Sequence, residues 1–132
     1  MRVVFDTNIF ISALVIPGSQ AEKAVFRILD GDDTLLISKP ILDELLTTLA
    51  RKFSRDSEAL SQVAVMLTEM SEMVKPKSTV EVFKDDPDNR VLECAESGQA
   101  DAIVTGDKEM LQLKQYQGIR LISLRDYLAR KW

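Results

Sequence analysis

Near its start the chain reads Val3-Val4-Phe5-Asp6-Thr7-Asn8, an apolar run followed at once by polar residues. The apolar run is typical of a short strand, whereas Asp, Thr and Asn favour turns and helix caps. The pattern therefore predicts that Asp6 lies at the carboxyl end of a first strand. A similar pattern occurs late in the chain, where the apolar residues 102–104 are followed by Thr105-Gly106-Asp107. Asp107 is expected to follow a strand as well.

The segments between and after these strands alternate between helical and strand patterns. Apolar residues recur at helical spacing in some of them, and short apolar runs typical of strands make up the others. The predicted helices cover 21–29, 40–53, 56–73 and 89–98, and the predicted strands cover 34–37, 80–83 and 119–122. Ser38 is expected to cap the helix that follows it. Ser123 and Asp126 resemble a capping box that opens a last helix running to Trp132.

Strands that alternate with helices favour a parallel sheet covered on both faces. We therefore predict the fold class α/β, with a central, mostly parallel sheet. The 132 residues are enough for one hydrophobic core, so residues 1–132 are expected to form a single domain. Ligands of such sheets bind outside the carboxyl ends of the strands, which is where Asp6 and Asp107 are expected.

The composition restricts the chemistry that the chain can perform. It has a single cysteine, Cys94, and no histidine, so the common sulfur and nitrogen ligands of metals are nearly missing. Any bound metal must be held by oxygen, which favours a hard ion such as Mg²⁺ or Mn²⁺. The lack of histidine also excludes catalysis by a Ser-His or Cys-His pair.

Neither a membrane span nor a secretion signal is expected. The apolar run 9–16 ends at Pro17, short of the roughly 20 residues that a membrane helix needs. A lone cysteine cannot form an internal disulfide, which fits a reducing compartment, so we predict a cytoplasmic protein. The net charge of −4 gives no general footprint for nucleic acid, although Arg51, Lys52 and Arg55 form a local basic cluster.

The two acids at strand ends have two interpretations. Carboxylates that share one sheet edge repel each other unless a cation lies between them, and two-metal hydrolytic sites use such convergent carboxylates. Alternatively, each acid only caps the helix that follows it. Local pattern alone leaves both interpretations open.

Four segments, in order over nearly the whole chain, resemble the PIN-domain family, and more narrowly its VapC-type toxin ribonucleases of toxin–antitoxin systems. The segments are Val3–Ile9, Ser38–Leu45, Asp86–Ala95 and Ala100–Lys108. The resemblance implies a three-layer α/β/α fold and an endoribonuclease that hydrolyses RNA phosphodiester bonds with Mg²⁺ or Mn²⁺. It also implies a cognate antitoxin protein as inhibitor, and a possible homodimer. The apolar residues of the helices within 41–73 fit either a dimer surface or the core, because periodicity does not distinguish the two.

The resemblance assigns the acids of the site. Asp6, Glu44 and Asp107 match catalytic metal ligands. A further acid is expected at the start of the helix before Asp107, where the matching residue is Asn89. Asn89 offers only an uncharged oxygen, so either Asp88 or Asp86 supplies the missing carboxylate or the site binds metal more weakly.

Helical geometry bears on these assignments. Asp88 projects close to the apolar side of its predicted helix, whereas Glu44 falls opposite a leucine stripe, so Glu44 rests on the resemblance alone. Thr7, Asn8 and Thr105 are candidate hydrogen-bond partners that orient the ligands, although ordinary turn chemistry explains them equally well. A structural role is expected for Asp101, which lies before its strand.

Two alternative functions remain. One is a PIN scaffold with weakened catalysis that acts as a binding module, an interpretation that Asn89 favours. The other is a phosphate-accepting domain similar to response-regulator receivers, which carry an acidic pair directly after the first strand. Here Thr7 and Asn8 follow Asp6 instead.

Overall fold

A six-stranded sheet forms the centre of the computed structural model, which describes residues 1–130. The strands lie in the order β3-β2-β1-β4-β6-β5. Their bounds are β1 Arg2–Phe5, β2 Thr34–Ser38, β3 Ser71–Val74, β4 Ala102–Val104, β5 Gln115–Tyr116 and β6 Ile119–Ile122. All neighbours pair in parallel except β5 with β6. The predicted α/β class with a mostly parallel sheet is confirmed.

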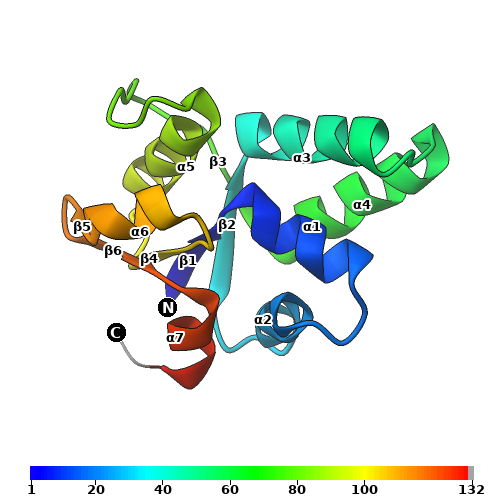
Figure 1. The fold of residues 1–132 in the computed structure, drawn as a ribbon, viewed down its shortest axis with the longest axis horizontal. Helices are drawn as coiled ribbons and strands as arrows, with labels where there is room; N and C mark the ends of the chain where they lie inside the picture. Colours follow the sequence, from blue (N-terminus) through cyan, green and yellow to red (C-terminus); the bar gives the residue numbers. More distant parts are fainter. Residues whose placement is uncertain (131–132) are drawn as a thin grey trace.

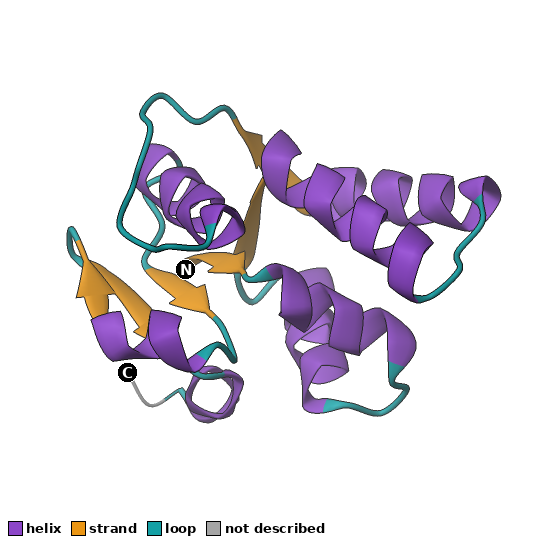
Figure 2. Ribbon diagram, turned by 45° about the horizontal axis from the view of Figure 1, so that its top comes forward, coloured by secondary structure: helices purple, strands orange, loops and turns teal. Residues whose placement is uncertain are grey.

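Helices lie on both sides of these strands (Figures 1 and 2). They are α1 Thr7–Val15, α2 Gln20–Leu29, α3 Lys39–Lys52, α4 Ser57–Met70, α5 Asp86–Ser97, α6 Lys108–Leu113 and α7 Leu124–Ala129. The chain moves from β1 to β2 in one direction and from β3 to β4 in the other, so right-handed connections place α2 and α5 on opposite faces. No single helix of residues 1–130 is long and apolar enough to cross a membrane, although α1 and α2, bent by 101°, pass that test together.

The core is centred on β1, β2 and β4, three of the four inner strands. Every apolar residue of these three strands is fully buried, because helices cover both faces of the sheet. Strands buried on both faces are continuous apolar runs rather than alternating ones, which explains why the sequence revealed them. On the face of α1 and α7, the ring of Phe5 lies 5.7 Å from the rings of Phe10 and Tyr127.

The third strand lies elsewhere than predicted. Residues 80–83 form no strand but a loop, and β3 is instead Ser71–Val74, which cuts the helix expected over 56–73 at Met70. Val80 is buried, but against α5 rather than within the sheet. β3 is an edge strand with exposed Glu72 and Met73, so its sequence lacks the apolar run that marks the inner strands.

Further local predictions differ from the structure. α1, α6 and β5 were not predicted, and α5 begins earlier than expected, at Asp86. Ser38 occupies the N-cap position of α3, but its side chain makes no capping hydrogen bond, so that prediction is wrong. Ser123 does accept a hydrogen bond from the Asp126 amide at 3.0 Å. The last helix ends at Ala129 with Arg130 as its C-cap, so the predicted helix is too long at residue 130, and residues 131–132 lie outside the described part of the chain.

Candidate active site

The carboxyl ends of β1 and β4 meet where the strand order reverses. The chain leaves β1 for β2 on one side and returns later to β4 on the other side. Such a switch point opens a crevice beyond the strand ends, where open α/β sheets bind their ligands. Asp6 directly follows β1, and Asp107 follows β4 after a short turn, so both acids lie at this crevice.

Asp6 is held by Thr105. The side chain of Asp6 is buried, and its Oδ2 accepts a hydrogen bond from the Thr105 hydroxyl at 2.8 Å. The same hydroxyl oxygen accepts a hydrogen bond from the Asp107 amide at 3.0 Å. Burial raises the pKa of Asp6, the Thr105 hydrogen bond opposes this rise, and the charge of Asp107 adds to it. Thr105 thus connects the side chain of Asp6 to the backbone of Asp107.

The capping interpretation applies to one acid and not to the other. Asp107 Oδ1 accepts hydrogen bonds from the amides of Glu109 at 2.8 Å and Met110 at 3.2 Å, which caps α6. Asp6 occupies the N-cap position of α1, yet its side chain makes no capping hydrogen bond. Capping therefore accounts for one oxygen of Asp107 but does not explain why Asp6 is buried.

Glu44 reaches the same crevice from α3. Its Oε2 accepts a hydrogen bond from the Thr7 hydroxyl at 3.2 Å. Burial raises the pKa of Glu44, the Thr7 hydrogen bond opposes the rise, and the charges of Asp6 and Asp85 add to it. The helical wheel predicted a solvated position, and that was wrong because the buried face of α3 is centred on Ile41, Leu45 and Leu49, which leaves Glu44 at its flank. The resemblance indicated this residue where periodicity did not.

Asp88 is a further buried carboxylate at the crevice, in the first turn of α5. Only 8% of the residue is exposed, and none of the groups that shift its pKa is a hydrogen-bond donor. Burial is the main cause that raises the pKa of Asp88 to about 7, and the charges of Asp6 and Asp107 contribute next. A carboxylate is thus buried beside other carboxylates without a compensating group.

Asn89 points away from this cluster and holds a loop. Its Oδ1 accepts hydrogen bonds from the amides of Val82 at 3.0 Å and Phe83 at 2.7 Å. Its Nδ2 donates to the Phe83 carbonyl at 2.8 Å. The amide group is therefore engaged with the backbone, and no periodicity in the sequence indicated this role.

The remaining candidates divide between the site and its surroundings. Asn8 and Asp86 are exposed, whereas Asp6 and Asp88 are buried and Glu44 and Asp107 are half-buried. Asp101 lies at the opposite end of the sheet, where its Oδ2 accepts a hydrogen bond from the Arg2 amide at 2.8 Å. That contact matches the structural role expected for it. Sequence reasoning missed Asp85, an exposed acid whose charge acts on both Glu44 and Asp88.

The carboxylate oxygens of these side chains are the kind of ligand that a hard divalent cation prefers, but their positions do not enclose an ion. The charged groups that act on Asp6, Glu44 and Asp88 are all carboxylates, so a cation would relieve their mutual repulsion. Oxygen ligands are those that Mg²⁺ and Mn²⁺ prefer. As the side chains stand, however, no three acidic residues among residues 1–130 form a group that could hold an ion. Binding would require side-chain rotation.

Comparisons with known proteins bear directly on this arrangement. The sequence profile of the PIN domain matches residues 2–109, which include Asp6, Glu44, Asp88 and Asp107. The chain belongs to the PIN-domain family. An uncharacterized protein of Methanocaldococcus jannaschii is 29% identical to this PIN domain over 118 residues, covering 86% of this chain and 76% of that protein. The predicted family resemblance is confirmed.

Solved structures share the fold of this PIN domain. A chain in the crystal structure of VapBC2 from Rickettsia felis, bound to a DNA fragment from its promoter, superposes with a TM-score of 0.67 at 16% identity, covering 93% of this chain and 98% of that one. A chain of VapBC-1 from nontypeable Haemophilus influenzae has a TM-score of 0.66 at 18% identity, covering 95% and 99%. At these identities the likeness is one of fold.

Proposed function

We propose that this PIN domain is a metal-dependent endoribonuclease that hydrolyses RNA phosphodiester bonds. Asp6, Glu44, Asp88 and Asp107 would hold Mg²⁺ or Mn²⁺ at the switch point of the sheet. The observation that carries the proposal is Asp88, a carboxylate buried against other carboxylates with no compensating donor. Burying a charge in this way is costly unless a counter-ion is supplied, so such acids are retained where a cation or a reaction needs them.

In this proposal the acids of the site hold the ion, and two threonines position those acids. A divalent ion held by these residues would supply a lowered pKa of bound water and neutralisation of negative charge on a phosphate. Thr105 fixes Asp6 and the backbone of Asp107, and Thr7 fixes Glu44. Because the chain has no histidine, a carboxylate of the cluster accepts the proton of the attacking water.

A direct test measures Mn²⁺ binding by calorimetry and cleavage of single-stranded RNA in the same samples. We expect Asp88→Asn to weaken both, with Asp101→Asn as the matched control, because Asp101 is an acid at the far end of the sheet. Cleavage that persists in EDTA, or that is unchanged by Asp88→Asn, would reject the proposal.

We also propose an antitoxin partner, as the named VapBC complexes suggest by analogy of fold. A supporting feature is the apolar surface between α2 and α4, where Phe26, Leu29 and Val65 are each at least half exposed. The same surface could instead join two copies of this chain. Co-purification with the product of an adjacent gene, compared with light scattering of the chain alone, separates the two. A cytoplasmic location stays a prediction from the lone, buried Cys94.

A catalytically weakened PIN scaffold is the second candidate. The observation that favours it is that the acids do not enclose an ion as they stand. Asn89, which first suggested it, has a different role here because its amide binds the loop backbone. Calorimetry decides between the candidates, since a weakened site would bind no Mn²⁺ in a manner that depends on Asp6. Membership of the PIN family leaves the receiver-like alternative without support.

A further inference from the structure

Residues 77–85, which we call the strap, run alongside α5 on their way from β3 into that helix. Side chains spaced four residues apart on α5 bind strap amides in succession, so each turn of the helix makes one attachment. The attachments are the Lys77 amide to Ser97 Oγ at 2.9 Å, the Val80 amide to Glu93 Oε2 at 2.8 Å, and the Val82 and Phe83 amides to Asn89 Oδ1. The strap therefore lies antiparallel to α5 rather than forming a free loop.

Asn89 makes the attachment nearest the site. Both its amide oxygen and its amide nitrogen bind the strap, and only 1% of the residue is exposed. An aspartate here could accept the two backbone N–H groups, but it could not donate to the Phe83 carbonyl and would repel it. The chemistry of this position therefore requires an amide.

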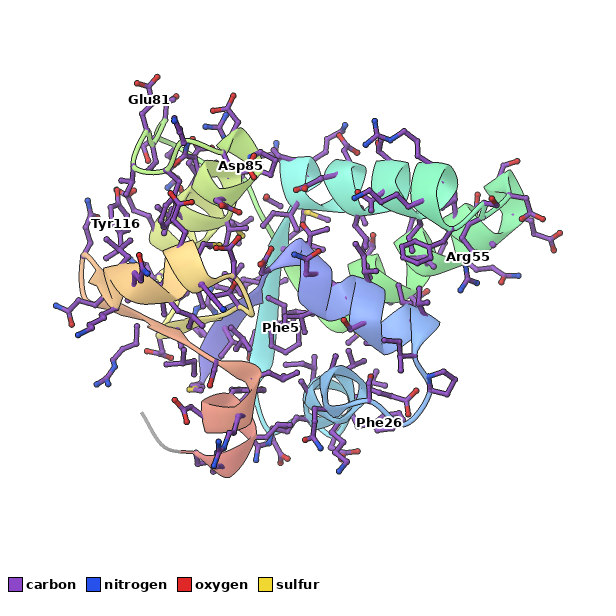
Figure 3. The ribbon with its side chains drawn as sticks, viewed as in Figure 1. Phe5, Phe26, Arg55, Glu81, Asp85 and Tyr116 are labelled. Carbon is purple, nitrogen blue, oxygen red and sulfur yellow. The ribbon has the colours of Figure 1, made fainter. Side chains whose placement is uncertain are left out.

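The strap ends at the carboxylate cluster. Asp85, its last residue, occupies the N-cap position of α5 but makes no side-chain capping bond. Figure 3 shows Asp85 at the start of α5, on the side of α3, the helix that carries Glu44. Its charge acts on both Glu44 and Asp88. Lys84 of the strap is exposed and directly precedes Asp85, so the chain brings a cation next to the residue whose charge acts on Glu44 and Asp88. Glu81 lies at the outer end of the strap, away from Asp85 (Figure 3).

We propose that Asn89 is a positioning residue that pins the strap, so that the exposed Lys84 beside Asp85 forms one wall of the path by which a phosphodiester chain reaches the carboxylates. This inference rests on the proposed nuclease function for its consequence, although the pinning itself does not. Lys84 supplies the wall with a cation beside an acidic site, where a polyanion would otherwise be repelled.

The first experiment follows amide hydrogen exchange in the full chain. In Asn89→Ala, two backbone amides lose their acceptor, so exchange at Val82 and Phe83 should accelerate by about tenfold or more. Ser97→Ala is the matched control, because it frees the Lys77 amide at the other end and should leave Val82 and Phe83 protected. Unchanged exchange at these amides in Asn89→Ala would overturn the pinning, whether or not the protein cuts RNA.

A second variant, Asn89→Asp, separates positioning from metal binding. If Asn89 stood in for a ligand, the added carboxylate would tighten Mn²⁺ binding and raise cleavage. We expect neither effect. Mn²⁺ affinity should stay within about threefold of the original, and loss of the donor to the Phe83 carbonyl should speed amide exchange at Phe83 and raise KM for RNA. Tighter Mn²⁺ binding with an intact strap would overturn the proposal.

The exposed Lys84 tests the wall without risk to folding. Lys84→Ala should raise KM for RNA several-fold at low salt, leave kcat nearly unchanged, and reduce the salt dependence of KM. Lys23→Ala, which removes an exposed cation on α2, is the control. If the parent cleaves RNA and Lys84→Ala has the same KM as the Lys23→Ala control, the proposed role of the strap in RNA binding is wrong, whereas the proposed nuclease function is kept. If no variant or parent cuts RNA, the proposed function fails and the exchange result still stands.

Discussion

The two ends of the parallel sheet treat their acids in opposite ways. At the amino ends of the strands, Glu72 pairs with the Arg2 guanidinium and Asp101 binds the Arg2 amide, and the pKa of Glu72 is lowered by Arg2. At the carboxyl ends, burial and neighbouring carboxylates raise the pKa of both Asp6 and Asp88. The acids at the amino ends are thus paired with Arg2, whereas at the carboxyl ends Asp6 accepts a hydrogen bond from Thr105 and Asp88 has no donor among the groups that shift its pKa.

This difference indicates that the acids at the amino ends stabilise the fold, whereas those at the carboxyl ends serve the proposed chemistry. Glu72 and Asp101 are exposed and have a donor in Arg2, whereas burying a charged acid without a donor is costly. An acid that stays buried without one needs another reason to be there, and a bound cation is the reason most consistent with an oxygen-only donor set. Changes to the acids at the carboxyl ends should therefore affect metal binding and cleavage, whereas changes to the acids at the amino ends should not.

The largest expected effect is on RNA cleavage by Asp6→Asn. Loss of a charged ligand at the centre of the cluster should lower the cleavage rate by about a thousandfold or more, since charge neutralisation by the ion contributes several kcal/mol to the transition state. Initial rates on single-stranded RNA with Mn²⁺ measure it. Asp101→Asn should retain the parent rate. Equal losses of cleavage rate in the two variants would contradict the proposal that only the acids at the carboxyl ends of the strands take part in cleavage.

A smaller effect is expected from Thr105→Val. The substitution keeps the side-chain shape but removes the hydroxyl that donates to Asp6 and accepts from the Asp107 amide. Changes to residues that orient ligands typically cost about 10- to 100-fold in metal affinity or activity. Mn²⁺ titration and cleavage rates should both fall in this range. An unchanged Mn²⁺ affinity would show that Thr105 belongs only to the turn.

Asp88→Asn should stabilise the metal-free protein at alkaline pH. The folded-state pKa of Asp88 is about 7, above its ordinary value near 3.8, so the folded state binds this proton more strongly than the unfolded state does. The contribution of the group to stability is therefore complete below about pH 4 and is lost as the pH rises through 7. At pH 8 the variant should gain on the order of 2 kcal/mol in free energy of unfolding, after allowance for solvent screening.

Urea denaturation of both proteins in EDTA, at pH 4 and at pH 8, measures this gain. The advantage of Asp88→Asn should vanish at pH 4 and shrink when Mn²⁺ is added to the parent. An advantage of equal size at both pH values would mean that the charge of Asp88 is not its cause.

The smallest effect is expected at the amino ends of the strands. Glu72→Gln removes the charge of an exposed partner of Arg2, and such pairs contribute little to stability. Arg2 still donates to the Gly98 carbonyl at 2.8 Å, so the melting temperature should change little and RNA cleavage should be unaffected. A clear loss of cleavage would mean that the two ends are coupled through the sheet.

Much of the fold was predictable because its inner strands are buried on both faces. Such strands carry continuous apolar runs, and turn residues end them sharply, so β1, β2, β4 and β6 were recognised together with Asp6 and Asp107 beyond two of them. The edge strand β3 was missed because half of an edge strand meets solvent and its sequence looks like the end of a helix. Val80 was assigned to a strand although its burial comes from α5.

The other two acids of the site depended on more than local pattern. Family resemblance indicated Glu44, but its place beside Thr7 follows from how α3 rotates to bury Ile41 and Leu45. The choice between Asp88 and Asn89 lay outside sequence reasoning, since neighbouring residues on a helix point about 100° apart. The tertiary structure distinguishes the two residues, because the backbone of the strap runs along α5 and binds the Asn89 amide group. The Asp88 carboxylate has no such partner and lies near the acids that follow β1 and β4.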